Sequence, residues 1–225
     1  MIRVMIGYDP NEVVAYHVLA HSILRHASEP VSVTPLKLSQ LPLKRARHPQ
    51  QSTEFAFSRF LVPWLCRWEG RAIFMDCDML CRSDIAELWQ LPQQCAVDVV
   101  QHDYEPKDGT KFLGQSQAVY KKKNWSSLMV FDNAQCRLLQ PETVDTVDGL
   151  YLHQFKWAET VGSLPVEWNH LVGEYDPNPR AKIAHFTLGG PWFKGCRDVE
   201  FSDEWRIEWD KMLTHADSVP LKAVA

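Results

Sequence analysis

Short apolar runs alternate with segments of helical periodicity along the first half of the chain. Five runs have the length and composition of buried strands, and they cover residues 3–7, 31–38, 72–75, 96–100 and 128–131. Helix-like segments or polar loops separate most of them. Because parallel strands need crossover connections, this pattern predicts an α/β fold with a mixed, mostly parallel sheet and helices on both faces.

Three of the connecting segments carry helical signals. Apolar residues recur at helical spacing through residues 11–27, with Asn11 as the expected cap. Residues 53–68 resemble a second helix, but Pro63 predicts a kink or break just before it. A third helix is expected to begin at Asp84, which has the form of a capping residue.

The second half of the chain is less regular. Residues 103–123 are polar and rich in lysine, and we expect them to form a loop. Residues 205–215 have the pattern of a C-terminal helix. We therefore expect a single domain over residues 1–215, followed by a short tail over residues 216–225.

Composition narrows the function classes. Of the 225 residues, 45% are hydrophobic and 11% aromatic, enough for a sizeable core. The net charge of −4 gives no basis for nonspecific nucleic-acid binding. The first apolar run is too short for a signal peptide, and no run is long enough for a transmembrane segment. The six cysteines lack zinc-site spacing, so we expect reduced thiols in a cytoplasmic protein, which could still bind peripherally at the inner face of a membrane.

The stretch after the third apolar run carries the clearest chemistry. Asp76 and Asp78 follow the strand directly, and ligands of open parallel sheets bind beyond the carboxyl ends of the strands. Two carboxylates this close repel each other unless a cation lies between them. Mn²⁺ and Mg²⁺ prefer oxygen ligands and can take some of them from phosphates. The pair therefore indicates a site for a metal-bound diphosphate, with a solvated turn of helix-capping acids as the alternative.

The same stretch carries a resemblance to a known family. Asp76-Cys77-Asp78, with Asp84-Ile85 and Leu88-Trp89 downstream, resembles the D-x-D segment of retaining glycosyltransferases of the family 8 type. Three further stretches resemble family elements in the same order: SRFLVP at 58–63, LPVEWN at 164–169 and HFTLGGPW at 185–192. The resemblance covers residues 1–195 sparsely. It implies a GT-A fold and transfer of a hexose from a nucleotide-diphosphate donor, with a UDP-sugar expected.

For the metal and the diphosphate, the resemblance implies four further residues. His185 is the implied third ligand of the cation, and its imidazole suits Mn²⁺ better than Mg²⁺; a hydrogen-bonded core histidine is the alternative. Gly189 and Gly190 are implied to bring backbone N–H groups to the phosphates. The family has a lysine where this chain has Gly190, and Lys194 is the expected substitute.

For the nucleotide, the resemblance points to the end of the first strand. Gly7, Tyr8 and Asp9 are implied to bind the base and ribose, with Tyr8 stacking on the base and Asp9 accepting hydrogen bonds. Cys77, between the two acids, is implied to contact the donor as well. Arg59 is implied to hold sugar hydroxyls or phosphate with its guanidinium, and a surface ion pair is its equally expected alternative.

For the donor sugar, two positions are implied. Ser126 lies in a run comparable to the family's Asn-small-Gly stretch, although Asn124 stands one place early and serine replaces glycine. Gln154 matches the middle of the family's D-Q-D and would lie beneath the anomeric carbon, where it and Arg59 would act in catalysis. Since Gln154 supplies no carboxylate, we expect retention by a same-face substitution through a short-lived ion pair.

Two other functions remain open at this point. A nucleotidyltransferase would carry a glycine-rich, basic loop after the first strand, but residues 7–12 are acidic. A nucleotide-sugar-binding protein without turnover is compatible with the missing lysine. The acceptor and the oligomeric state are not specified by the sequence, and a glycan or a lipid-linked acceptor is equally compatible with it. We expect residues 103–123 and the C-terminal helix to shape the acceptor site.

Overall fold

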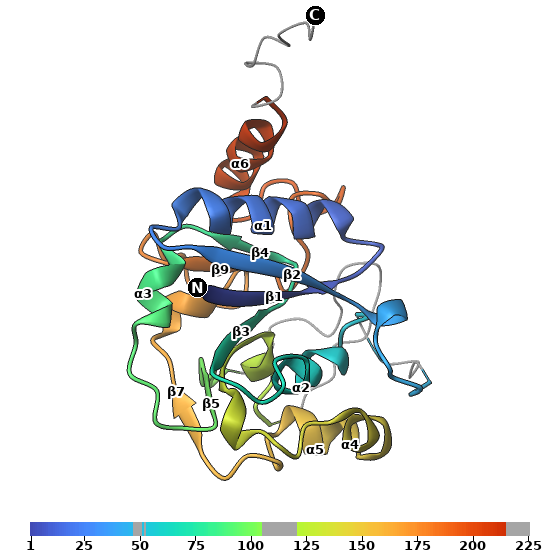
Figure 1. The fold of residues 1–225 in the computed structure, drawn as a ribbon. Coiled ribbons are helices and arrows are strands. Elements are labelled where there is room, and N and C mark those ends of the chain that lie inside the picture. Colours follow the sequence, from blue (N-terminus) through green and yellow to red (C-terminus); the bar gives the residue numbers. More distant parts are fainter. Residues whose placement is uncertain (47–50, 52, 105–120, 215–225) are drawn as a thin grey trace, which may run out of the picture.

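A computed structural model of the chain describes residues 1–46, 51, 53–104 and 121–214 (Figure 1). The expected loop at residues 103–123 lies mostly outside the described residues, and the expected tail lies wholly outside them. The strands are β1 (Ile2–Tyr8), β2 (Val31–Lys37), β3 (Arg71–Met75), β4 (Met79–Cys81), β5 (Val97–Val99), β6 (Leu128–Asp132), β7 (Val161–Ser163), β8 (His170–Leu171) and β9 (Ile183–His185). The α-helices are α1 (Val13–His26), α2 (Val62–Leu65), α3 (Ile85–Trp89), α4 (Pro141–Thr146), α5 (Gly149–His153) and α6 (Ser202–Thr214). Short 3₁₀ helices are η1 (Leu38–Gln40), η2 (Ser58–Leu61), η4 (Trp125–Ser127), η5 (Asn133–Gln135) and η6 (Val166–Asn169).

The central sheet has six strands in the order β2-β1-β3-β6-β5-β7. Strand β1 pairs in parallel with β2 and β3, and β5 pairs in parallel with β7, whereas β6 runs antiparallel between β3 and β5. Helix α1 lies on one face with α6 outside it, and α2, α4 and α5 lie on the other (Figure 1). The predicted class, a mixed and mostly parallel sheet flanked by helices in one domain, is confirmed.

Strand directions bring the functional segments to one edge of the sheet. The parallel strands β1 and β3 both end there, and antiparallel β6 begins there, because Leu128 pairs with Met75. A second sheet, in the order β4-β9-β8, follows from this edge. In it the first residue of β4, Met79, pairs with the last residue of β9, His185. The residues just before β4 and at the end of β9 therefore meet, although more than a hundred positions separate them in the chain.

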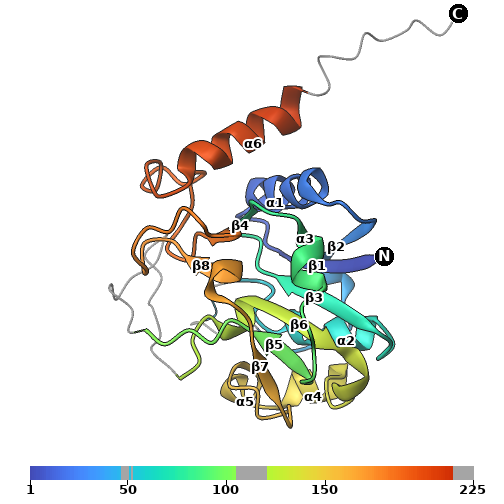
Figure 2. The same ribbon diagram turned by 90° about the vertical axis from the view of Figure 1, so that its left-hand side faces the viewer.

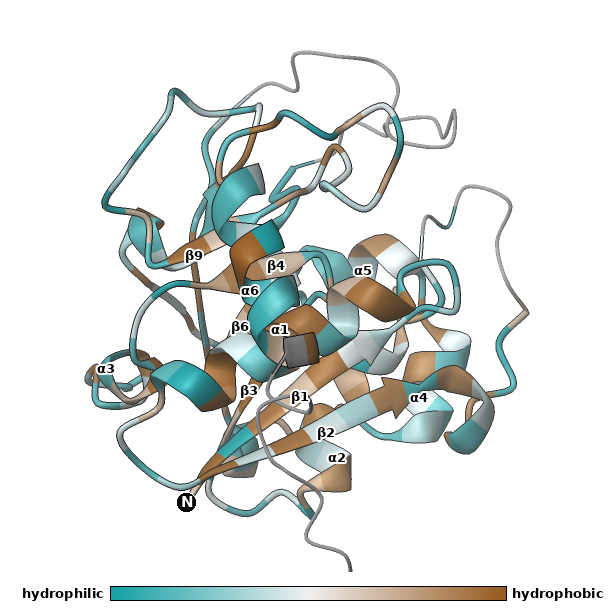
Figure 3. Cartoon of the chain, turned by 90° about the horizontal axis from the view of Figure 1, so that it is seen from above, coloured by the Kyte–Doolittle hydropathy of each residue, from teal (hydrophilic) through white to brown (hydrophobic). Residues whose placement is uncertain are grey.

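The core is continuous across the sheet. Its largest fully buried side chains include Trp168, Phe55, Phe60, Phe74 and Phe131. In Figure 3 brown colour runs along β1, while α4 and α6 each carry brown and teal, as expected for helices with one face toward the core. A smaller cluster around Phe186 and Trp205 joins α1, β4 and β9 to α6. Figure 2 shows α6 leaning over α1, so it closes the structure on that side.

The expected cap of the first helix is wrong. Helix α1 begins at Val13 after Glu12, and no side chain caps it. Asn11 instead turns back, and its backbone N–H and side-chain amide both donate to the carboxylate of Asp9, at 2.9 and 3.0 Å. The acid at the end of β1 captures the polar residue that the sequence pattern assigned to the helix.

The expected long helix over residues 53–68 is also wrong. Its first residues form turns, η2 covers Ser58–Leu61, and α2 is a single turn from Val62 to Leu65. The break falls just before Pro63, as predicted, because proline lacks the N–H that would continue the preceding turn. Arg67 and Trp68 then have positive φ values of 55° and 56°, which ends the helix before β3.

Candidate metal and donor site

The two acids of the D-x-D segment lie where β3 ends and β4 begins. The backbone N–H of Asp76 donates to the carbonyl of Ser127 at 2.9 Å, which ties the segment to the start of β6. The carbonyl of Asp78 accepts from the N–H of Phe186 at 2.8 Å, which ties it to the end of β9. Both acids are largely buried, and Asp78 is only 8% exposed. Asp84 caps α3 by accepting from the N–H of Ala86 at 2.9 Å, as expected.

His185 lies beside these acids. Its Nε2 atom is 3.4 Å from Oδ1 of Asp78. One ligand atom from each of Asp76, Asp78 and His185 can be chosen so that all three lie within 4.8 Å of one another. A site of this size is compatible with one divalent cation that binds all three side chains.

The protonation of His185 suits a metal ligand. Its Nδ1 atom lies 2.9 Å from Oδ1 of Asn169, and an amide oxygen can only accept a hydrogen bond. In the neutral ring Nδ1 therefore carries the proton, and the lone pair of Nε2 faces the acids. Two carboxylates and a neutral imidazole form a donor set that Mn²⁺ accepts readily, and Mg²⁺ less so.

Glu12 is a buried acid behind the pair that the sequence pattern did not single out. It is 2% exposed, and Oε2 accepts from the thiol of Cys77 at 3.5 Å. Burial, with the nearby charge of Asp78 as the next contribution, raises the pKa of Glu12 to about 9. Burial likewise raises the pKa of the Cys77 thiol well above its ordinary value. The Cys77 side chain thus faces Glu12 in the interior, so a contact with a donor would have to come from its backbone.

Arg59 is a buried residue that organises the site. Its Nη1 atom is 2.8 Å from Oδ1 of Asp76 and donates to the carbonyl of Ser126 at 2.8 Å. The guanidinium lies within 5.2 Å of the ring centroid of Phe55 and 5.0 Å of that of Phe74. Of the two expectations for Arg59, the ion pair is present, but it is internal rather than on the surface. In this structure the guanidinium orients Asp76.

The three residues at the end of β1 all contact other residues of the protein. Both carboxylate oxygens of Asp9 accept backbone N–H groups, from Asn11 at 2.9 Å and from Glu54 at 3.0 Å. Tyr8 is partly buried, and its ring meets that of Tyr16 edge to face with centroids 5.5 Å apart. A Cβ atom at Gly7 would lie 2.3 Å from the ring of Phe55. The glycine is therefore needed for packing, whatever it contacts in a ligand.

The glycine pair after His185 also has structural roles. Gly189 adopts a φ of 114°, and its N–H donates to the carbonyl of Phe186 at 2.7 Å, so that amide is engaged in a turn. A Cβ atom at Gly190 would lie 2.0 Å from the ring of Trp192. Lys194 is exposed. The amide of Gly189 would have to leave its turn to reach a phosphate, whereas the Lys194 side chain faces solvent.

The two residues expected near the donor sugar lie on adjoining elements. The hydroxyl of Ser126 in η4 is 2.8 Å from Nδ1 of His153, the last residue of α5. Gln154 follows directly and is partly buried, and its backbone carbonyl accepts from Lys122 at 3.0 Å. Burial, together with the charge of Arg59, lowers the pKa of His153 to about 3, so its imidazole is neutral. The structure therefore brings Ser126, His153 and Arg59 together.

A group of aromatic side chains near His185 was not anticipated from the sequence. Nδ1 of His102 lies 2.7 Å from the hydroxyl of Tyr175, and the amide of Asn124 donates to the hydroxyl of Tyr104 at 2.7 Å. Burial is the main cause that lowers the pKa of His102 to about 3. The tyrosines and His102 come from segments without periodicity, so only their spatial proximity identifies them.

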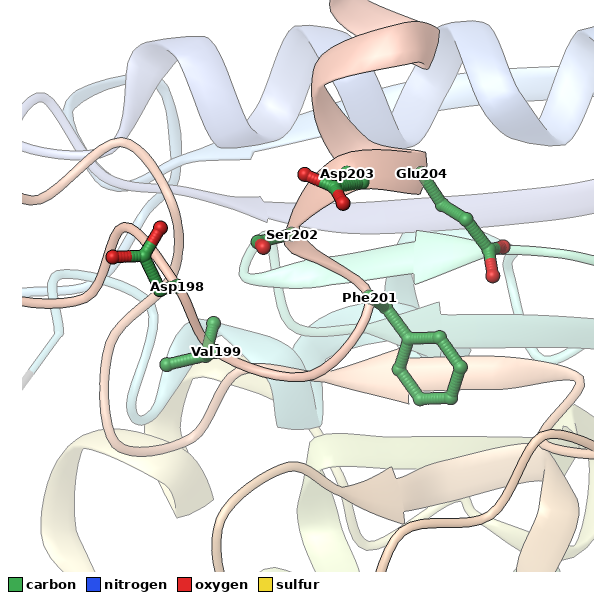
Figure 4. Close-up of a pocket in the computed structure, with 6 residues that line it drawn as sticks. All are labelled: Asp198, Val199, Phe201, Ser202, Asp203 and Glu204. Atoms are coloured by element: carbon green, nitrogen blue, oxygen red, sulfur yellow. The ribbon is translucent and has the colours of Figure 1, made fainter.

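A separate surface hollow lies at the start of α6. It is lined by Asp198, Val199, Phe201, Ser202, Asp203 and Glu204 (Figure 4). Arg206 pairs with Asp203 at 2.9 Å, and Arg82 pairs with Glu204 at 2.7 Å. No residue expected to contact the donor lines this hollow, so it is separate from the candidate donor site.

A family model and a relative of known sequence both match this chain. The family model described as glycosyl transferase family 8 matches residues 11–138. The Arabidopsis thaliana protein named Protein CDI is 44% identical over 223 residues, which cover 93% of this chain and 86% of that protein.

Solved structures show the same fold at low identity. The bifunctional glycosyltransferase WbbM in its apo form superposes with a TM-score of 0.64 at 17% identity, over 96% of this chain and 50% of that one. The galactosyltransferase LgtC, in complex with donor and acceptor sugar analogues, gives 0.60 at 10% identity over 98% of both chains. GlyE of Streptococcus pneumoniae TIGR4 gives 0.60 at 13% identity, over 96% of this chain and 63% of that one.

Proposed function

Because the chain belongs to glycosyl transferase family 8, we propose that it transfers a hexose from a UDP-sugar with retention, in a reaction that depends on Mn²⁺ or Mg²⁺. That the chain is a glycosyltransferase with a GT-A fold follows from the family and from the solved structures. The donor, the cation and the stereochemistry form the proposal. The single observation that carries it is the meeting of Asp76, Asp78 and His185 at the carboxyl edge of the sheet.

The proposed cation site fits the residues around it. Asp76, Asp78 and Nε2 of His185 would hold the ion, which when bound neutralises the diphosphate and stabilises the leaving group. Arg59 fixes the orientation of Asp76 through its ion pair at 2.8 Å. In the proposal Tyr8 and Asp9 bind the base and ribose, and Lys194, as the exposed cation near the glycine pair, turns toward the phosphates.

For the transfer step we propose a same-face substitution. The bond between the anomeric carbon and the diphosphate oxygen breaks, and a bond from that carbon to the acceptor oxygen forms on the same face. The proton of the acceptor hydroxyl passes to an oxygen of the departing diphosphate, so no protein base is consumed. Gln154, which carries an amide in place of a carboxylate, lies in the segment proposed beneath the sugar, and Ser126 would bind one of its hydroxyls.

For the acceptor we propose a chemical class, a sugar hydroxyl of a glycan or of a lipid-linked saccharide. LgtC, which was solved with both donor and acceptor sugar analogues, shares the fold over 98% of both chains. None of the helices that the structure describes is both long and apolar enough to cross a membrane. Family membership favours glycosyl transfer over the two alternatives left by the sequence, a nucleotidyltransferase and a nucleotide-sugar-binding protein without turnover.

A donor screen tests this proposal. Thermal shifts are measured with UDP-, GDP- and ADP-sugars, each with and without Mn²⁺, and donor hydrolysis is then followed as release of the nucleoside diphosphate. We expect stabilisation and turnover by a UDP-hexose only when the cation is present. Equal shifts with and without Mn²⁺ would contradict the metal-dependent mechanism, and turnover of another nucleotide sugar would contradict the proposed donor.

Replacement of a proposed ligand tests the site directly. Asp78→Asn keeps the shape of the side chain but removes its charge, so we expect turnover to fall on the order of 10²–10³-fold while the protein stays folded. Circular dichroism and the thermal midpoint check the fold. Asp198→Asn, at an exposed acid outside the site, is the matched control and should leave turnover unchanged. Full activity of a folded Asp78→Asn variant would count against the cation site.

A further inference from the structure

We propose that Ser127 and Asn169 are positioning residues that hold His185 in the one neutral tautomer able to bind a divalent cation. Three hydrogen bonds, which we call the relay, connect them: Ser127 Oγ to the carbonyl of Asn124 at 2.7 Å, Asn169 Nδ2 to Ser127 Oγ at 2.8 Å, and His185 Nδ1 to Asn169 Oδ1 at 2.9 Å. The inference rests on the proposed cation site at Asp76, Asp78 and His185.

The direction of every bond in the relay follows from its first acceptor. A backbone carbonyl cannot donate, so the hydroxyl of Ser127 must give its only proton to Asn124. Ser127 Oγ can then only accept from Asn169, which turns the NH₂ end of that amide toward the serine. The oxygen end of the amide is left facing His185, and it can only accept, so the proton of the imidazole lies on Nδ1. In the neutral ring Nε2 is then the unprotonated nitrogen, and it lies 3.4 Å from Oδ1 of Asp78.

Burial makes the relay hard to replace. Asn169 is 0% exposed, Ser127 2% and His185 1%, so bulk water does not reach these groups to supply a substitute bond. If the amide of Asn169 rotated by half a turn, its NH₂ group would face His185, and Nδ1 would have to accept. The proton would then move to Nε2, where it would point at the acids and block coordination. Orientation of one amide thus decides whether the imidazole is a ligand.

Ser127 connects both halves of the proposed cation site. Its backbone carbonyl accepts from the N–H of Asp76 at 2.9 Å, while its side chain orients His185 through Asn169. Three elements end at this junction: the 3₁₀ helices η4 and η6 and the strand β9. A merely structural serine would stabilise this junction without affecting the ring of His185, and the two roles make different predictions.

The experiment reads the tautomer first, in the protein without added metal. Long-range ¹H–¹⁵N correlation spectra distinguish a protonated from an unprotonated ring nitrogen, and the His185→Gln spectrum assigns the signal among the nine histidines. At a pH where the ring is neutral we expect the wild-type signal to show protonated Nδ1 and unprotonated Nε2, and a neutral ring protonated at Nε2 would overturn the proposal outright. In Ser127→Ala the constraint on the amide is lost, so protonated Nε2 should become populated.

Metal affinity is the second readout, measured by calorimetric titration with Mn²⁺ alone. We expect Ser127→Ala to bind Mn²⁺ about 10–100-fold more weakly than the wild type, the size of effect known for partners of metal-ligating histidines. The double variant Ser127→Ala/Asn169→Asp should recover protonated Nδ1, because either carboxylate oxygen accepts from it. An unchanged tautomer and affinity in Ser127→Ala would overturn the relay.

Ser22→Ala provides a matched control for loss of a buried hydroxyl. Ser22 donates to the carbonyl of Leu19 at 2.8 Å and accepts from the N–H of Cys81 at 3.1 Å, as Ser127 does with its own partners. The Ser22→Ala variant should have a lower thermal midpoint but an unchanged His185 spectrum and Mn²⁺ affinity. If Ser22→Ala lost as much Mn²⁺ affinity as Ser127→Ala, the effect of Ser127→Ala would be explained by lower stability alone. A wild type with protonated Nδ1 but no affinity for Mn²⁺ would leave the relay standing and reject the cation site.

Discussion

At the scale of single residues, several positions near the site are explained by packing. Gly7 and Gly190 are glycines because the rings of Phe55 and Trp192 occupy the space of their Cβ atoms. Phe55 in turn lies beneath the guanidinium of Arg59, which holds Asp76. A substitution at Gly7 that displaces Phe55 would therefore also displace Arg59 and, through it, Asp76.

Gly7→Ala tests this packing. The new methyl group would lie 2.3 Å from the fully buried ring of Phe55, so we expect the free energy of unfolding to fall by about 1–3 kcal/mol. Denaturant titration measures it. Gly195→Ala is the control, because apart from its chain neighbours no residue has a heavy atom within 4 Å of the Cβ position there, and it should be neutral or slightly stabilising. Equal stability of both variants would show that the ring moves aside freely.

At the scale of elements, helix α6 depends on a few contacts with α1. Glu208 of α6 is 2% exposed and lies 2.6 Å from Nδ1 of His21 and 2.6 Å from Nη2 of Arg25. Burial raises the pKa of Glu208, but the hydrogen bonds from Arg25 and His21 outweigh it, so the pKa lies below its ordinary value. Trp205 adds the apolar contact, at 5% exposure. The helix is thus anchored at one buried acid and one buried ring.

Glu208→Ala should loosen α6 without unfolding the sheet. The change removes charge-assisted hydrogen bonds worth about 1.5–3 kcal/mol each, so we expect amide exchange in α6 to accelerate at least about tenfold. Hydrogen exchange with peptide-level mass spectrometry measures it. Asp203→Ala, at an 89% exposed acid on the same helix, should leave exchange unchanged. Unaltered exchange in Glu208→Ala would mean that Trp205 and its neighbours hold the helix alone.

At the scale of the whole molecule, buried titratable groups make opposing contributions to the pH dependence of stability. The pKa values of His102 and His153 are lowered to about 3, so those groups destabilise the fold as the pH falls below about 6.5. The pKa values of Glu12 and Asp98 are raised to about 9 and about 6, chiefly by burial, and these acids act in the opposite direction. The profile of the wild type therefore conceals each contribution, and a single-site variant is needed to reveal one.

Asp98→Asn isolates one such contribution. Between about pH 4 and 6 the native carboxyl binds a proton that the unfolded chain, with a pKa of 3.8, does not, so the wild type loses stability as the pH rises through that window. The neutral amide has no such loss. We expect the variant to be more stable than the wild type by about 1–3 kcal/mol at pH 7 and equal to it near pH 4. Denaturant titrations across the window measure the difference, and a constant offset at all pH values would contradict the raised pKa.

Local patterns were sufficient for five of the six strands of the central sheet and for its class, whereas β7 was not predicted. The apolar runs at residues 3–7, 31–38 and 72–75 became β1, β2 and β3 with shifts of a residue at their ends. The proline break before Pro63 was also predictable, since it depends on one residue. The helix around it and the cap at Asn11 were predicted wrongly. Asp9 competes for Asn11 from two positions upstream, and its other carboxylate oxygen accepts from the N–H of Glu54, a contact that only the tertiary structure shows.

The sequence by itself determined the family resemblance, the sheet that carries the site and the acid pair at its edge, because these depend on residue types within short windows. The resemblance implied that His185 meets those acids, and the tertiary structure brings them together. Tertiary structure alone decided that Arg59 faces inward to Asp76 and that Asn169 and Ser127 orient the imidazole. These contacts join segments tens to more than a hundred positions apart, and strand order with antiparallel register brings them together. No local periodicity encodes such a meeting, because it depends on how the second sheet folds back onto the first.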